Sequence, residues 1–228
     1  MNFGTISGDI ISSTSLSGDD KRRLEESLYN LFAEIEARFS DVAFLGRVVQ
    51  GDHVECAMEK PQYVLRMALL LKTYIKSLEL PKDKPKDKRI ERFREHGLRL
   101  ATAVAPLDTF DPKTGIIDGE AIQLSGRAIK NLDTSEKQKV IIKSTMFFRS
   151  PDQSVEEQFA PVFALLDVLL SKSSAKQCQV IYYKLLGFNE GEIAQKLGKY
   201  QSTINQHSTA AGWHAIEKTV KYFEKLMV

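Results

Sequence analysis

The chain has 228 residues, of which 43% are hydrophobic, and a formal net charge of +2 at pH 7. This length can form two small globular domains. The near-neutral charge excludes a whole-molecule electrostatic attraction to nucleic acid, and two cysteines are too few for a disulfide framework. Met1–Ile11 lacks the basic start of a secretion signal, and the longest apolar stretch, Val162–Leu170, is too short to span a bilayer. We therefore expect a cytoplasmic protein with no membrane partner.

Residues 1–150 alternate strand and helix signals, which predicts one α+β domain. The order is βαββαβ with later additions, and this order is typical of a ferredoxin-like fold. In chain order, the predicted elements are a strand at Phe3–Ile11, a helix at Asp19–Phe39, strands at Val42–Val49 and His53–Met58, a helix from Pro61 to about Leu78, a strand at Leu98–Pro106, a helix at Gly119–Leu132, a short strand at Val140–Ile142 and a helix beginning near Ser144.

The segment from Pro81 to Arg94 is highly charged and interrupted by proline. It has too little apolar surface to fold alone, which predicts a loop.

Two aspartates lie where strands are predicted to end. Asp9 closes the first strand, and Asp52 lies in the turn between the second and third strands. In a βαββαβ sheet the first strand is central and neighbours this hairpin, so the two carboxylates can converge on one Mg²⁺ or Mn²⁺ ion. The alternative is structural, because Gly-Asp pairs often only mark turns.

Four short motifs in this domain resemble the palm-like core of class III nucleotide cyclases, over most of residues 3–132. They read G-D-I-I-S-S-T at 8–14, G-D at 51–52, G-L-R-L-A-T-A-V at 97–104 and D-G-E-A-I-Q-L-S-G-R at 118–127. The Gly-Asp-Ile segment is also similar to that of bacterial SatD-like proteins.

The cyclase resemblance implies a role for several residues. Asp9 and Asp52 would bind the metal ion of a nucleotide complex. Arg127 and Gln123 would act on the transition state across a homodimer interface. The amides and hydroxyls of the Ser12, Ser13 and Thr14 segment would face phosphate, although capping of the next helix is the simpler role for these three residues.

Several positions depart from the cyclase pattern. Gln123 replaces an asparagine, Val48 stands where a purine-selecting lysine is expected, Ala103 and Ala105 replace glycines, and His53 follows the second aspartate. These changes predict a degenerate cyclase-like domain that dimerises and senses a nucleotide or a metal ion.

Residues 151–172 are too apolar for a free linker, so we expect a connecting helix. Residues 173–228 then read as a helix-turn-helix domain. Asn189 and Glu192 form a capping-box pattern, Ile193 and Leu197 share one helix face, and Gly198 permits a sharp turn. A closing helix at Trp213–Met227 is expected to seal this small core.

The same region resembles the DNA-binding modules of sigma-factor region four and of LuxR-type regulators. The matching residues are Gly187, Glu192-Ile193-Ala194, Leu197-Gly198, Thr203-Ile204 and His207. Amides read base edges and hydroxyls suit phosphates, so the candidate DNA-binding residues are Lys199, Gln201, Ser202, Thr203, Asn205, Gln206 and His207. Because residues 200–207 contain no arginine or lysine, a helical docking module is the alternative.

These features favour a bacterial DNA-binding transcriptional regulator that acts as a homodimer on double-stranded DNA and responds to a nucleotide effector. The second hypothesis is a metal-dependent nucleotidyl cyclase or phosphoryl-transfer enzyme that uses Asp9 and Asp52. The third is a protein-interaction adaptor.

Overall fold

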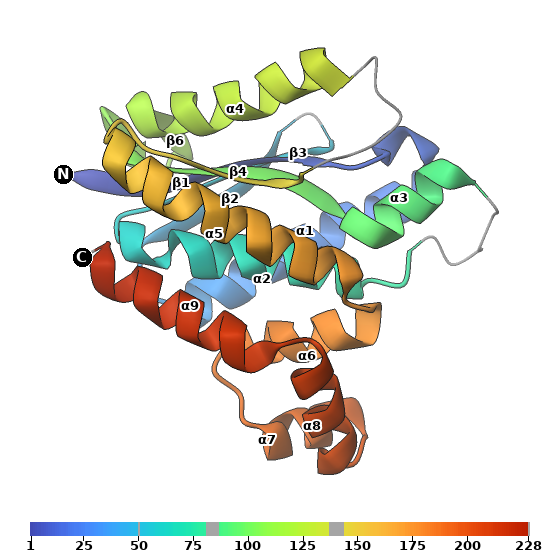
Figure 1. The fold of residues 1–228 in the computed structure, drawn as a ribbon. Helices are drawn as coiled ribbons and strands as arrows, with labels where there is room; N and C mark the ends of the chain where they lie inside the picture. Colours follow the sequence, from blue (N-terminus) through green and yellow to red (C-terminus); the bar gives the residue numbers. More distant parts are fainter. Residues whose placement is uncertain (50, 81–86, 137–143, 228) are drawn as a thin grey trace.

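The computed structural model describes residues 1–49, 51–80, 87–136 and 144–227, and within these ranges the centre is a five-stranded sheet (Figure 1). The spatial order of the strands is β2-β3-β1-β4-β7, and only the β4–β7 pair is parallel among them. Without β7 this is the ferredoxin-like order, so the α+β prediction is confirmed. The strands are β1 (Asn2–Ile10), β2 (Phe44–Val49), β3 (His53–Met58), β4 (Leu98–Pro106) and β7 (Met146–Arg149), with a separate hairpin of β5 (Thr109–Asp111) and β6 (Ile116–Asp118).

Helices cover both faces of the sheet. The described helices are α1 (Gly18–Arg38), α2 (Val64–Ser77), α3 (Lys88–His96), α4 (Glu120–Glu136), α5 (Gln153–Lys172), α6 (Ala175–Leu185), α7 (Glu190–Leu197), α8 (Gln201–Ala210) and α9 (Trp213–Leu226), with 3-10 turns at η1 (Ser13–Ser15) and η2 (Pro61–Tyr63). Figure 1 shows α4 on one face and α1 and α2 on the other, with α6 and α9 beyond α2. Helices α7 and α8, with their connection (190–210, the tip), project farthest from the sheet.

The two faces of the sheet differ because strand residues alternate in direction. In β1, Ile6 and Ile10 are buried in the main core on the side of α1 and α2. Ser7 points toward α4, where its hydroxyl lies 2.9 Å from that of Ser125. Thr5 also faces α4 and donates to the carbonyl of Ala121. The α4 face of the sheet therefore has polar contacts at β1, next to a small apolar cluster in which Ala101 of β4 packs with Ala128 and Ile129 of α4.

The last helix does not close the small helix-turn-helix core, so that expectation is wrong. Phe223 of α9 is fully buried in the main core, with its ring centroid 4.8 Å from that of Phe159. In the tip, Ile193, Ala194 and Ile204 form a separate cluster with Val180 of α6. Helix α9 buries Ile216, Val220 and Phe223, and the main core offers these side chains more apolar neighbours than the small cluster beside the tip does. The domain boundary after residue 172 stays a prediction.

The expected loop at 81–94 and the expected helix near Ser144 also differ from the structure. The second half of the expected loop is helix α3, which Asp87 caps and which buries Ile90 and Phe93. Instead of a helix near Ser144, the chain forms β7, whose alternate residues are buried as in an edge strand. The strand predicted at Val140–Ile142 lies outside the described residues.

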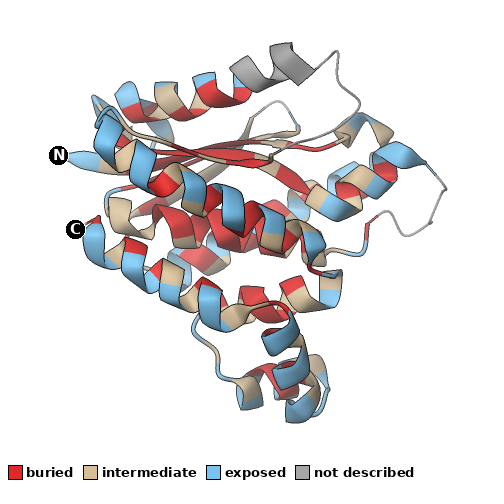
Figure 2. Cartoon of the chain, in the orientation of Figure 1, coloured by how far each residue is buried: buried red, intermediate tan, exposed pale blue. Residues whose placement is uncertain are grey.

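Both cysteines are unpaired and buried. No helix in the described ranges combines the length and the apolar character needed to cross a lipid bilayer. Figure 2 shows that the most continuous burial runs through the sheet and α2, whereas the tip is mainly exposed or half-buried.

Candidate functional site

A charged cluster of Asp9, Arg47, His53 and Glu55 lies on the α4 side of the sheet. Asp9 pairs with His53 across β1 and β3, and Ser7 pairs with Glu55 two residues away. Since Ser7 faces α4, alternation places Asp9, His53 and Glu55 on the same face. Arg47 joins them because it pairs with Glu55 across β2 and β3.

These four side chains form one continuous network. The distance from His53 Nδ1 to Asp9 Oδ1 is 2.6 Å, and that from His53 Nε2 to Glu55 Oε1 is 3.7 Å. Arg47 donates from Nε and Nη2 to Glu55 Oε2 at 2.9 and 2.6 Å. It also donates to the carbonyl of Gly115, which ties the network to the β5–β6 hairpin.

The contacts within this network shift the pKa values of His53 and Glu55. The hydrogen bond with Asp9, followed by the interaction with Glu55, raises the pKa of His53 to about 9. The interaction with His53, with a further contribution from Arg47, lowers the pKa of Glu55 to about 2. At neutral pH an imidazolium therefore lies between two carboxylates.

Asp52 is held separately from Asp9. The amide of Ile10 donates to the carbonyl of Asp52 at 3.0 Å, so the two strand ends are adjacent as expected. The carboxylate of Asp52, however, accepts a 2.6 Å hydrogen bond from Ser13, whereas that of Asp9 contacts His53. Among the described residues, no group of three or more His, Cys, Asp and Glu side chains has a geometry suited to a metal ion.

The predicted phosphate segment forms η1 rather than a helix cap. Ser12 has a left-handed backbone with φ of 56°, and the side chain that caps α1 is that of Ser17. Ser13 is engaged with Asp52. The metal role of Asp9 and Asp52 and the phosphate role of Ser12, Ser13 and Thr14 stay predictions.

Gln123 and Arg127 lie on the outer side of α4. Both are exposed, whereas Ala121 and Ser125 of the same helix are buried against the sheet. Arg127 donates to Gln123 Oε1 at 3.2 Å. Within one chain, α4 separates this pair from the sheet face that carries the charged cluster. Its action across a homodimer interface stays a prediction.

The sequence analysis missed the cluster around His53. The signal was present in the hairpin, where His53 and Glu55 are two residues apart and therefore share a face. Arg47 then faces Glu55 once the register of the hairpin is fixed. The sequence therefore contains enough information to place Arg47, His53 and Glu55 on one face of the β2–β3 hairpin.

The tip consists of two short helices joined by a tight turn. Asn189 and Glu192 form a complete capping box at the start of α7, and Gly198 ends it with φ of 60°. Ile193 and Ala194 of α7 pack with Ile204 of α8 in a small separate core. The local sequence signals therefore produced the predicted pair of short helices.

Most of the predicted DNA-binding side chains lie together on α8 and its approach. Lys199, Gln201, Ser202, Asn205 and Gln206 are exposed, and Thr203 and His207 are half-buried. Asn205 donates to Glu190 Oε2 at 3.2 Å. Helix α8 begins after Tyr200 with no side-chain cap, and the amides of Thr203 and Ile204 donate to the carbonyl of Tyr200.

Comparison with solved structures finds similarity to a bacterial light-regulated adenylyl cyclase. The two chains have 13% sequence identity and a TM-score of 0.43, over 64% of this chain and 74% of that one. No protein-family model and no curated protein matches the chain.

Proposed function

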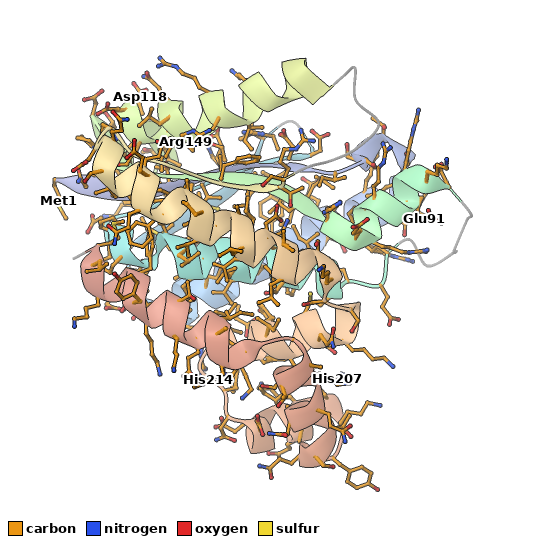
Figure 3. The ribbon with its side chains drawn as sticks, in the orientation of Figure 1. Met1, Glu91, Asp118, Arg149, His207 and His214 are labelled. Atoms are coloured by element: carbon orange, nitrogen blue, oxygen red, sulfur yellow. The ribbon has the colours of Figure 1, made fainter. Side chains whose placement is uncertain are left out.

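We propose that this chain is a bacterial transcriptional regulator that binds double-stranded DNA through the tip. The observation that carries the proposal is the placement of α8. This helix projects from the body with a polar, exposed surface (Figure 2), and Figure 3 shows His207 at this end of the molecule, far from the sheet.

The chemistry of α8 fits a duplex. The amides of Gln201 and Gln206 can donate to and accept from adenine edges in the major groove. Lys199 and the uncapped amides at the start of α8 suit backbone phosphates. One module with so few cations binds weakly, and two half-sites add their binding energies.

A homodimer supplies the second half-site. The proposal is supported by apolar side chains exposed on α5 and α9, where Leu165 is 72% exposed and Val168 and Tyr222 are about half exposed. A second copy that covers these side chains would remove apolar surface from water. In this arrangement α5 and α9 form the dimer interface, and the sheet domain is the effector-sensing part of the regulator.

The test is a mobility-shift assay of the full chain with random duplexes at low and moderate salt. We expect binding that Gln201→Ala and Gln206→Ala weaken, each by about 1–3 kcal/mol at preferred sequences. Lys199→Ala should weaken binding to all duplexes and lower the salt slope by about one. Lys113→Ala, an exposed lysine of the β5–β6 hairpin, is the matched control. Absence of a shift at low salt would contradict the proposal and favour a protein-interaction adaptor.

The second candidate is a metal-dependent nucleotidyl cyclase. It is favoured by the adjacency of the strand ends that bear Asp9 and Asp52. His53 disfavours it, because a charged imidazolium already neutralises Asp9. Incubation with nucleoside triphosphates and Mn²⁺ is the test, with Asp52→Ala as the comparison. Product formation by the parent that the variant lacks would make the cyclase the better proposal.

A further inference from the structure

A cavity of about 580 Å³ lies where the end of α2, helix α3 and the link between α5 and α6 meet. These elements come together at one end of the molecule in Figure 1. Part of the lining is apolar, and those residues are Ile75, Leu78, Leu80 and Phe93. The cavity lies outside the charged cluster and outside the tip.

Two cationic side chains, Lys76 and Arg94, line this cavity, and neither forms an ion pair with a carboxylate in the described structure. Lys76 is buried, and the hydrogen bonds of its Nζ go to the backbone carbonyls of Leu170 and Ser171, at 2.5 and 3.1 Å. Burial lowers the pKa of its ammonium group. In Arg94, the Nη2 atom is buried and has no hydrogen-bond acceptor. A buried charge in this state is unfavourable until an anion joins it.

Lys72, one turn earlier on α2, differs from Lys76 because it has a carboxylate partner. It is also fully buried, but its Nζ lies 3.4 Å from Asp167 Oδ1 and 2.5 Å from the Thr145 hydroxyl. The protein thus supplies a counter-ion for Lys72 and none at this distance for Lys76. The difference between them is that Lys76 lines an open cavity.

We infer that this cavity binds a small organic carboxylate with an apolar body. The carboxylate would pair with Lys76 and Arg94, and its carbon atoms would contact the apolar lining. Glu79 and Glu95 also line the cavity and are exposed, which places them at its mouth and disfavours a phosphate dianion there. This site is independent of DNA binding.

The cavity also borders the route to the tip. Ser173 and Ser174, which precede α6, belong to its lining. The two carbonyls that hold Lys76 belong to the last turn of α5. An anion bound here therefore lies directly beside the connection between the two parts of the chain.

The experiment uses the full chain and benzoate as the probe. Three compounds serve as controls. Benzyl alcohol has the same ring and no charge, benzylamine has the same ring and a positive charge, and inorganic phosphate has a negative charge and no ring. At constant ionic strength, we expect benzoate to raise the melting temperature in a saturable way and the other three to have little effect. Arg94→Gln should weaken benzoate binding about tenfold, which calorimetry would measure. Arg89→Gln, on the exposed start of α3, should leave it unchanged.

A second measurement needs no variant. Benzoate should shift the amide NMR signals of residues 93–95 and 171–175 before those of the tip. Lys76→Met is the alternative variant if Arg94→Gln does not fold. Equal stabilisation by benzoate and benzylamine, equal benzoate affinity in a folded Arg94→Gln variant, or tighter binding of phosphate would each overturn the inference.

Discussion

The body and the tip are stabilised in different ways. The main core joins both ends of the chain, from Ile6 in β1 to Phe223 in α9. The tip packs on α6 through a separate core with four buried members among the described residues, which are Val180 of α6 and Ile193, Ala194 and Ile204 of the tip. Its shape rests on local signals, which are a capping box and a left-handed glycine. Long-range burial thus fixes the body, whereas capping and a thin core fix the tip.

The largest expected effect tests whether α9 belongs to the body. Phe223→Ala removes a ring that packs on Phe148, Phe159 and Phe163, which should cost about 3–5 kcal/mol of unfolding free energy. Urea denaturation followed by circular dichroism measures this loss. Lys225→Ala, at an exposed position of the same helix, should cost less than about 1 kcal/mol. Similar losses in both variants would mean that α9 is not docked as described.

A core substitution in the tip should act locally. Ile193→Ala leaves a cavity in the small cluster and should cost about 2–4 kcal/mol of local stability. Hydrogen exchange should show loss of protection in α7 and α8, with protection in β1 and β4 retained. Gln195→Ala, exposed on α7, is the control. Global loss of protection would show that tip and body unfold together.

The charged cluster predicts a pH dependence of body stability. Because folding raises the pKa of His53 to about 9, its stabilisation is complete below about pH 6.5 and is lost as the pH rises through 9. We expect about 1–2 kcal/mol of this loss after allowance for solvent screening. Urea unfolding at pH 6 and about pH 10 measures it. If His53→Gln shows the same loss as the parent, another group is responsible.

An effect of similar size, but confined to the tip, concerns its turn. Gly198→Ala should cost about 1–2 kcal/mol, because φ of 60° is unfavourable for a residue with a Cβ atom. A clash is not the cause, since no atom lies within 4 Å of the added Cβ. Gly18→Ala has equally open surroundings and an ordinary φ, so it should be neutral or slightly stabilising. Local unfolding free energies from hydrogen exchange distinguish the two, and equal effects would contradict this account.

The candidate site was predictable in position but not in its contacts. Sequence alone located Asp9 and Asp52 at adjacent strand ends, because strand and turn signals in the hairpin are strong. It did not show that Asp9 contacts His53 while Asp52 contacts Ser13. Those partners depend on register, on side-chain direction and on the turn at η1, which are set when strands pair.

The sequence by itself determined the α+β class, the order of the first sheet strands and the two short helices of the tip. These features follow from hydrophobic periodicity and capping residues, which act over a few positions. Only the tertiary structure decided that α9 packs on the body, that segment 88–96 forms a helix and that Lys76 and Arg94 share a cavity. Each of these depends on which apolar surface is available from residues distant in the chain, and local patterns carry no information about that surface.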